Sequence, residues 1–514
     1  MRAAPELKPE PHSGSASLRR KFAQSPYALL QGGADERSRV DPNSGCNLYG
    51  VAPNVAEAEV HFGSSTASPL SPRGRLAVEE AWRSLTSSDV GADLSLGAWF
   101  EDIRARILAW CGDPDADCIL APSGTEAELL ALAIACACWG RPVSNIVLAP
   151  EETGSGVSLA SVGAHFLDSS PHSADVRKGA RLAGWENNDF RFEPIEIRCA
   201  DGRLRDAEDV DQEAEARARA AIAQGRGVLV HLLDVSKTGA SALSVAAARR
   251  IRDQAPDRTL VVADCCQLRS SPARLKELAN SGFMVALTGS KFAGGPPFSG
   301  ALLVPRGLLD RMKAAALPDG LGAHSARLDW PADCGGQVAA VAKAGANLGL
   351  GLRWSAALSE MERCKAISDD LSADIHLMFA QAVQGGVAGL PGSRLLWPTM
   401  GEVGVRTSIV PILLRQPNGI GFTRGEASAL QCALRRPISG AASGPRRAFH
   451  VGQPVRIGAA HALRICLSAP LVNDIADRAR AGMSRERAFA PLAADLGDLF
   501  DKWASIWKTM ASRK

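Results

Sequence analysis

The sequence lacks the features that mark several common classes of protein. Its longest apolar stretch, residues 129–139, is too short to cross a bilayer, and its first residues contain no apolar signal core. The 514 residues include 58 lysines and arginines against 55 aspartates and glutamates, so the formal charge is only +3. No excess of one charge is present to bind nucleic acid or acidic lipid. We therefore expect a soluble, cytoplasmic protein that binds neither nucleic acid nor membrane.

The cysteines show no functional spacing either. There are 12 of them, several inside apolar runs, and together they lack the pattern of a disulfide framework. Cys265 and Cys266 are adjacent, but no second Cys or His pair stands at the spacing of zinc ligands. We expect reduced, mostly buried cysteines and no metal site.

Lysine is scarce, since only 12 of the 58 basic residues are lysines. Skewed codon usage explains such a ratio by itself. The scarcity nevertheless draws attention to the individual lysines and to what surrounds each of them.

Residues 1–45 are rich in proline, serine, glycine and charge, and they show no sustained apolar period, which predicts a flexible arm. Apolar residues recur at helical spacing over 76–85 and 99–110, which predicts two amphipathic helices.

Between residues 117 and 305, apolar runs alternate with helical stretches. The predicted strands are 118–121, 145–149, 227–233, 259–263, 283–287 and 300–304. The predicted helices between them include 126–138, 207–223 and 244–254. Such near-continuous apolar strands, separated by helices, predict a mostly parallel sheet covered on both faces. The polar segment 168–187 interrupts this pattern and is expected to be an insertion.

After residue 305 the pattern changes. Helical periodicity over 338–346 and 355–382 precedes strand-like runs at 405–414 and 462–468, and a last helical region follows. This order predicts a smaller α+β domain.

A capped helix start follows the first predicted strand of the sheet. Ser123 and Glu126 form the S-x-x-E capping pattern, and Gly124 and Thr125 lie between them. The free N–H groups of such a turn, with the helix dipole and the threonine hydroxyl, can bind phosphate. An ordinary capped helix accounts for the same residues.

Two further strands end in charged residues. Asp264 follows three apolar residues, and a buried carboxylate there needs a partner, either a structural salt bridge or a cationic heterocycle. Lys291 comes shortly after the next strand, beside hydroxyls and glycines. A lysine held among apolar groups loses its proton readily and can form a Schiff base; a solvated loop lysine has the same local pattern.

Arg464 lies within an apolar strand of the predicted small domain. A guanidinium suits a carboxylate, so this side chain could bind a substrate acid or form an interdomain ion pair.

Taken in order, these features resemble the pyridoxal-phosphate (PLP) enzymes of fold type I, in the class V aminotransferase and cysteine desulfurase branch. The resemblance rests on the S-G-T-E-A segment from Ser123, on Asp264 with Gln267 three residues later, and on Lys291, 27 positions after Asp264. It covers about residues 60–470. It implies an α/β fold, a mostly parallel central sheet with helices on both faces plus a smaller C-terminal α+β domain. It also implies pyridoxal 5'-phosphate as cofactor and a homodimer.

The resemblance assigns roles residue by residue. Lys291 would carry the cofactor in a Schiff base and move protons at the substrate's α-carbon. Asp264 would pair with the pyridine nitrogen, and Gln267 would lie near the phenolic oxygen. The residues that would hold the phosphate are Gly124, Thr125, Thr288 and Ser290. The residues that would meet the substrate are Arg464, at its α-carboxylate, and Ser65 and Thr66, at the entrance.

The resemblance also divides the chain. We expect a flexible arm over residues 1–45 and a segment over 46–90 that packs on the small domain and the substrate entrance. The large PLP-binding domain would then cover 91–320 and the small domain 321–514.

Some family positions are filled differently here. The histidine that many relatives place over the cofactor ring is absent, and Thr153 or Glu152 stands near its position. The asparagine near the phenolic oxygen is also absent, and its region holds Ser236 and Lys237, the latter either near the cofactor or solvated. No cysteine occurs between residues 440 and 463, which disfavours sulfur transfer through a cysteine persulfide.

We therefore expect a PLP-dependent enzyme acting on a small α-amino acid, with transamination as the first hypothesis. A PLP-dependent lyase, decarboxylase or carbon–carbon bond-forming enzyme is the alternative. A binding protein that keeps the fold without turnover is a third hypothesis.

Overall fold

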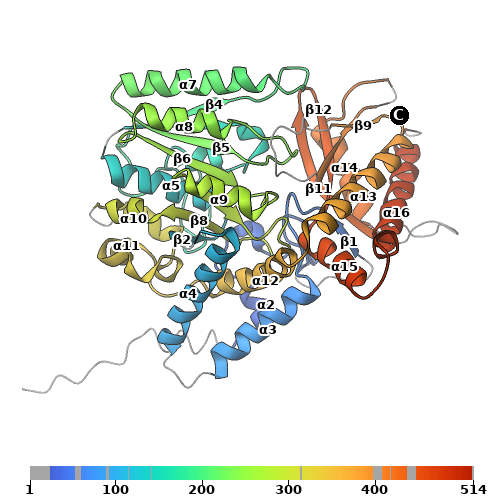
Figure 1. Ribbon diagram of the computed structural model, residues 1–514, viewed down its shortest axis with the longest axis horizontal. Coiled ribbons are helices and arrows are strands. Elements are labelled where there is room, and N and C mark those ends of the chain that lie inside the picture. Colours follow the sequence, from blue (N-terminus) through green and yellow to red (C-terminus); the bar gives the residue numbers. More distant parts are fainter. Residues whose placement is uncertain are drawn as a thin grey trace, which may run out of the picture.

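The protein is built around two β-sheets, which lie side by side in Figure 1. The computed structural model describes residues 23–52, 59–87, 92–113, 115–140, 142–312, 315–396, 408–416, 418–436 and 447–511. Within these ranges, no helix combines the length and the apolarity that a membrane crossing needs.

The larger sheet has the strand order β2-β8-β7-β6-β5-β3-β4. Its strands are β2 (Ala116–Ala121), β3 (Val143–Leu148), β4 (Phe190–Ile195), β5 (Gly227–Leu233), β6 (Thr259–Cys265), β7 (Met284–Thr288) and β8 (Gly300–Pro305). All neighbours are parallel except β8, which runs antiparallel to β2 and β7. Every residue of β3, β5 and β7 is buried. The predicted parallel sheet is confirmed.

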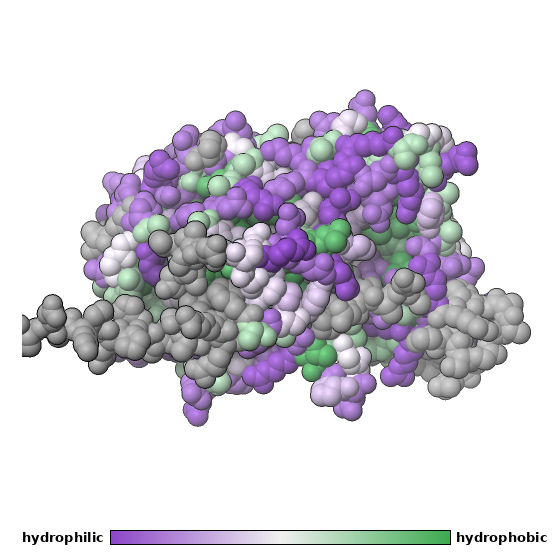
Figure 2. Space-filling model, turned by 90° about the horizontal axis from the view of Figure 1, so that it is seen from below, coloured by the Kyte–Doolittle hydropathy of each residue, from purple (hydrophilic) through white to green (hydrophobic). Residues whose placement is uncertain are grey.

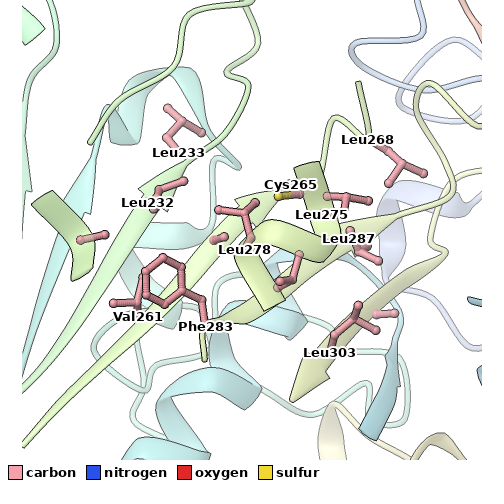
Figure 3. Close-up of a cluster of buried hydrophobic side chains, with 14 of the residues drawn as sticks. Leu232, Leu233, Val261, Cys265, Leu268, Leu275, Leu278, Phe283, Leu287 and Leu303 are labelled. Atoms are coloured by element: carbon pink, nitrogen blue, oxygen red, sulfur yellow. The ribbon is translucent and has the colours of Figure 1, made fainter. Parts of the chain in front are cut away.

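Helices cover both faces of this sheet, as the apolar strands require. One face packs against α4 (Ala92–Cys111), α7 (Ala207–Ala223), α8 (Val245–Gln254), α9 (Pro272–Asn280) and α12 (Leu348–Lys365). The other face packs against α5 (Gly124–Trp139), α10 (Arg306–Met312) and α11 (Gly335–Val341). Figure 3 shows part of the first core, in which Leu275 and Leu278 of α9 pack with Val261 and Leu287 of the strands.

The smaller sheet has the order β1-β11-β12-β10-β9. Its strands are β1 (Glu59–Phe62), β9 (Ser393–Leu395), β10 (Ile409–Leu414), β11 (Ala448–Ile457) and β12 (Ala460–Cys466). The helices packed in its core are α13 (Asp369–Ala388), α14 (Arg424–Arg435), α15 (Ala469–Arg480) and α16 (Arg485–Ala511). The α+β character expected after residue 305 is therefore present. Strand β1, however, comes from the N-terminal part of the chain and pairs in parallel with β11.

The helical pattern over 355–382 predicted one long helix, but the structure has two helices there. Helix α12 ends at Lys365, and α13 starts after Ser368, whose hydroxyl accepts the N–H of Leu371. Trp354 and Met361 of α12 belong to the core of the large sheet. The helix therefore joins the large domain, although it comes after residue 320.

The N-terminal segment is folded over much of its described length. Helix α2 (Pro26–Leu29) and a 3-10 turn (Glu36–Ser38) lie within the region expected to be an arm, and helix α3 (Pro72–Ser87) packs along α12. The buried guanidinium of Arg353 donates hydrogen bonds to the carbonyls of Leu30, Gly32 and Gly33. These bonds tie residues 30–33 to α12, while residues 1–22 lie outside the described residues.

The face of the molecule shown in Figure 2 is largely hydrophilic, with hydrophobic residues in small patches. The large hydrophobic side chains that are exposed among the described residues are Leu48, Leu76, Leu377, Ile420 and Met483. These five residues lie far apart in the sequence.

Candidate active site

A cavity of about 560 Å³ lies where the two domains meet. Its floor is formed by residues at or just beyond the carboxyl ends of the parallel strands β2, β3, β5, β6 and β7, the usual place for ligands in such sheets. Residues of the small domain, including Gln453 and Arg464, line the opposite side. The volume falls within the range of small-molecule sites.

The start of α5 forms one end of the cavity. Ser123 has an extended backbone, and its hydroxyl accepts the N–H of Thr125 at 3.1 Å, so the predicted cap is present. Gly124 stands in tight contact with the residue that follows β6, because a Cβ there would meet the sulfur of Cys266 at 2.5 Å. Thr125 is buried and, with Ser290, lines the same end. These backbone and hydroxyl donors suit a phosphate.

Asp264 and Lys291 reach the cavity from neighbouring strands. Asp264 lies on β6, next to β7, and one of its carboxylate oxygens accepts the N–H of Cys266 at 3.0 Å. Lys291 follows β7, and its carbonyl accepts the hydroxyl of Ser68 at 2.9 Å. Both side chains line the cavity. Thr288 also lines it, with its hydroxyl donated to the carbonyl of Cys266 at 2.5 Å.

Two polar atoms at the cavity lack a partner. The amide nitrogen of Gln267 donates to the carbonyl of Ser65 at 3.1 Å. The Oε1 atom of Gln267 and the hydroxyl of Ser65 are buried but make no hydrogen bond with any described residue. Buried polar atoms are rarely left in this state, so this wall fits a polar ligand.

Arg464 lies on β12 and faces the cavity from the small domain. Its Nη2 donates to the hydroxyl of Thr66 at 3.0 Å and to the carbonyl of Gln453 at 2.6 Å. Its Nη1 makes only a long contact, 3.4 Å, with the carbonyl of Lys237. No carboxylate of the described residues forms an ion pair with this guanidinium. Nη1 is therefore the end at which a bound carboxylate could be held.

Glu152 and Thr153 lie at the position where the sequence resemblance led us to look for a histidine. The Glu152 carboxylate is buried and accepts hydrogen bonds from Arg198, Ser236 and Thr238. It therefore holds the loop after β5 in place. Thr153 lines the cavity, with its hydroxyl donated to the carbonyl of Pro150 at 3.1 Å.

The loop after β5 places Lys237, rather than Ser236, on the cavity. The hydroxyl of Ser236 points to Glu152, at 2.7 Å, and Ser236 is not among the cavity-lining residues. Lys237 lines the cavity. Burial, and then the charges of Arg464 and Lys291, lower the pKa of Lys237 to about 7. Lys237 is half-buried and faces the cavity.

Several cavity residues were not found by sequence reasoning. They are Arg37, Tyr49, Glu128, Phe298, Arg424, Gln453, Arg456 and His461. Arg37 and Tyr49 come from the N-terminal segment, whose lack of apolar periodicity concealed them. Glu128 lies one turn inside α5 and contacts Nδ1 of His231 at 2.7 Å, and burial raises the pKa of its carboxyl. The polar residue within the apolar run 127–135 was the available signal for Glu128.

Several solved structures share this architecture, and one of those described here contains a PLP cofactor. A NifS-like protein matches at 14% identity with a TM-score of 0.52, over 86% of this chain and 98% of that chain. Mouse CSAD in its apo form matches at 15% identity with a TM-score of 0.52, over 86% and 84%. A mutant of C-DES with glycine covalently linked to its PLP cofactor matches at 15% identity with a TM-score of 0.51, over 85% and 96%.

These likenesses show that the chain has the fold type I architecture expected from the sequence. No protein-family model matches the sequence, and no curated protein sequence does so either. The identities are low, so the chemistry of the site has to be argued from its own residues.

Proposed function

We propose that this protein is a PLP-dependent enzyme that acts on an α-amino acid. The observation that supports this proposal is the meeting of Lys291, Asp264 and the α5 start at Gly124 and Thr125 around one cavity. A PLP group bound there supplies an electron sink for negative charge at the substrate's α-carbon.

Each of these residues has a distinct task. With PLP bound, the Lys291 amine would hold it covalently, and the same amine would move the proton at the substrate's α-carbon. The Asp264 carboxylate pairs with a protonated ring nitrogen and keeps it charged. Gly124, Thr125 and Ser290 hold the phosphate through backbone or hydroxyl donors, whereas Thr288, expected in the same role, donates its hydroxyl hydrogen to the Cys266 carbonyl. The unpartnered Oε1 of Gln267 accepts a donor from the ligand or from an ordered water.

The substrate side of the cavity is cationic and comes from the small domain. Arg464 binds the α-carboxylate through Nη1, with Ser65 and Thr66 on the same wall. Thr153 is the residue available beside the ring where relatives have histidine. We also propose the homodimer expected for this fold; size-exclusion chromatography with light scattering tests it.

Transamination is the reaction that we propose first. Elimination, decarboxylation or carbon–carbon bond formation is the alternative. Transfer of sulfur by a cysteine is disfavoured. Cys466 is buried within β12, and burial raises the pKa of the cavity-lining Cys266 well above the usual thiol range. A protonated thiol is a poor nucleophile.

Reconstitution with PLP tests the cofactor. The wild type should become yellow, and borohydride should fix one cofactor on the peptide that contains Lys291. Lys291→Ala should lose the fixed adduct, whereas Lys276→Ala, at an exposed lysine of α9, should keep it. A wild type that stays colourless with PLP contradicts the proposal. It also contradicts the alternative hypothesis of a binding protein that keeps the cofactor without turnover.

Products separate the reactions. Amino acids should convert the yellow protein to the pyridoxamine form, and a keto acid should reverse the change. Release of carbon dioxide, ammonia or sulfide, without that conversion, assigns the alternative chemistry.

A further inference from the structure

Three metal-ligating side chains lie together on the small sheet, away from the cavity. Glu59 and His61 belong to β1, and His450 stands directly opposite His61 on β11. Because side chains alternate along a strand, Glu59 and His61 point to one face, and the buried Val60 and Phe62 point to the other. The parallel register puts His450 on the same face as His61.

Their ligand atoms converge. Oε2 of Glu59 lies 3.3 Å from Nε2 of His61 and 3.3 Å from Nε2 of His450. Two atoms bound to one tetrahedral zinc, each about 2.05 Å from the ion, are about 3.3 Å apart. The two nitrogen–oxygen separations therefore equal edges of a zinc tetrahedron, and they exceed the 2.7–2.9 Å that is usual in a charged hydrogen bond.

His450 provides an independent sign that a partner is missing. The residue is only 7% exposed, and neither of its ring nitrogens makes a hydrogen bond with a described residue. An imidazole nitrogen without a hydrogen-bond partner is free to bind a metal.

The donor set selects the ion. Two imidazoles and one carboxylate suit Zn²⁺ and similar transition metals, whereas Mg²⁺ and Ca²⁺ prefer oxygen ligands throughout. The side chain of His61 is 13% exposed and that of Glu59 is 23% exposed, so water can reach a fourth position. The imidazole rings are stacked, with centroids 4.1 Å apart, and they must rotate to aim both lone pairs at one ion.

We propose that Glu59, His61 and His450 bind one Zn²⁺ ion, which fastens β1 to β11. Strand β1 has only four residues and lies at the edge of the sheet. The chain after it leads directly to Ser65 and Thr66, and β11 carries Gln453, all on the wall of the large cavity. The ion would thus hold together the two strands that shape the substrate side, whatever reaction that cavity performs.

Metal binding to the full chain tests this site. After treatment with a chelator, the protein should take up one Zn²⁺ in competition with a chromophoric indicator. Co²⁺ should give the intense visible absorption of a tetrahedral site, and Mg²⁺ should not compete. His61→Gln, His450→Gln and Glu59→Gln should each weaken zinc binding at least tenfold, while His172→Gln, a partly exposed histidine elsewhere, should bind as the wild type does.

A thermal measurement guards against misfolded variants. Zinc should raise the melting temperature of the wild type and of His172→Gln but leave that of His61→Gln unchanged, although its apo form melts cooperatively. The proposal is overturned if the wild type takes up no zinc, or if His61→Gln and His450→Gln bind it with unchanged affinity. Both readouts are independent of PLP and of catalysis, so their failure leaves the proposed function standing.

Discussion

At the scale of single residues, the site differs from its expected pattern at Glu152 and Lys237. The carboxylate and the lysine belong to two loops that face each other, and the backbone N–H of Lys237 donates to the Glu152 carbonyl at 3.0 Å. The Glu152 carboxylate accepts hydrogen bonds from the loop after β5 and so holds it in place, and that loop presents Lys237 to the cavity. The sequence placed both residues near the cofactor position, but it could not assign the direction of either side chain.

Lys237→Met should stabilise the cofactor-free protein, and more so at pH 7 than at pH 9.5. The pKa of Lys237 is about 7 in the folded chain, against 10.5 for an ordinary lysine. The unfolded chain therefore binds more protons between pH 7 and 10.5, and the wild type gains stability as the pH rises through this window. Methionine removes the penalty at neutral pH and has little to remove at high pH.

The melting temperature at the two pH values measures this effect, with a gain of roughly one to a few degrees at pH 7. Lys276→Met, at an exposed lysine of α9, is the control and should show no pH-dependent difference. An equal gain for Lys237→Met at both pH values would show that this lysine keeps an ordinary pKa.

At the scale of elements, the start of α5 depends on a close contact between a helix and a strand end. The sequence predicted the cap and the helix because both are local patterns. It did not predict that Gly124 lies against the sulfur of Cys266, which requires β2 and β6 to be brought together across the sheet. The sequence analysis also missed strand β4. This strand lies at the edge of the sheet, and its exposed Arg191 interrupts the apolar run that would have marked a strand.

Gly124→Ala should weaken PLP binding about tenfold or more, because the new Cβ would meet the Cys266 sulfur at 2.5 Å and push the helix start away from the phosphate position. The double variant with Cys266→Ala should recover most of the lost affinity, since the nearest remaining contacts are at 3.4 Å. Titration of the visible band with PLP measures both. Failure of the second substitution to restore binding would mean that this contact does not set the helix position.

At the scale of the whole molecule, the N-terminal segment contributes to both domains. It supplies β1 to the small sheet and Arg37 and Tyr49 to the cavity, and Arg353 of α12 holds residues 30–33. Composition made this region resemble a disordered arm. Its order comes from hydrogen bonds to a buried arginine more than 300 residues away in sequence, a distance that no local pattern reports.

Arg353→Met should release this segment and make it sensitive to protease, because several carbonyls lose their donor at once. Limited trypsin digestion followed by mass spectrometry should find early cleavage at Arg37 or Arg39 in this variant. Arg363→Gln, on the same helix and paired with Asp477 near the surface, should be cleaved there as slowly as the wild type. Equal protection of Arg353→Met would show that other contacts hold the segment.

The sequence by itself determined the parallel sheet, its covering helices and the order of Thr125, Asp264 and Lys291. These features are carried by apolar runs and by the residues at their ends, and the ends of parallel strands necessarily meet at one edge. Only the tertiary structure decided which loop side chains face the cavity, Lys237 among them. It also decided that Glu59 and His61 meet His450, because β1 pairs with a strand that lies almost 390 residues further along the chain. Such contacts depend on how distant segments pack, which the local pattern of residues in the sequence does not determine.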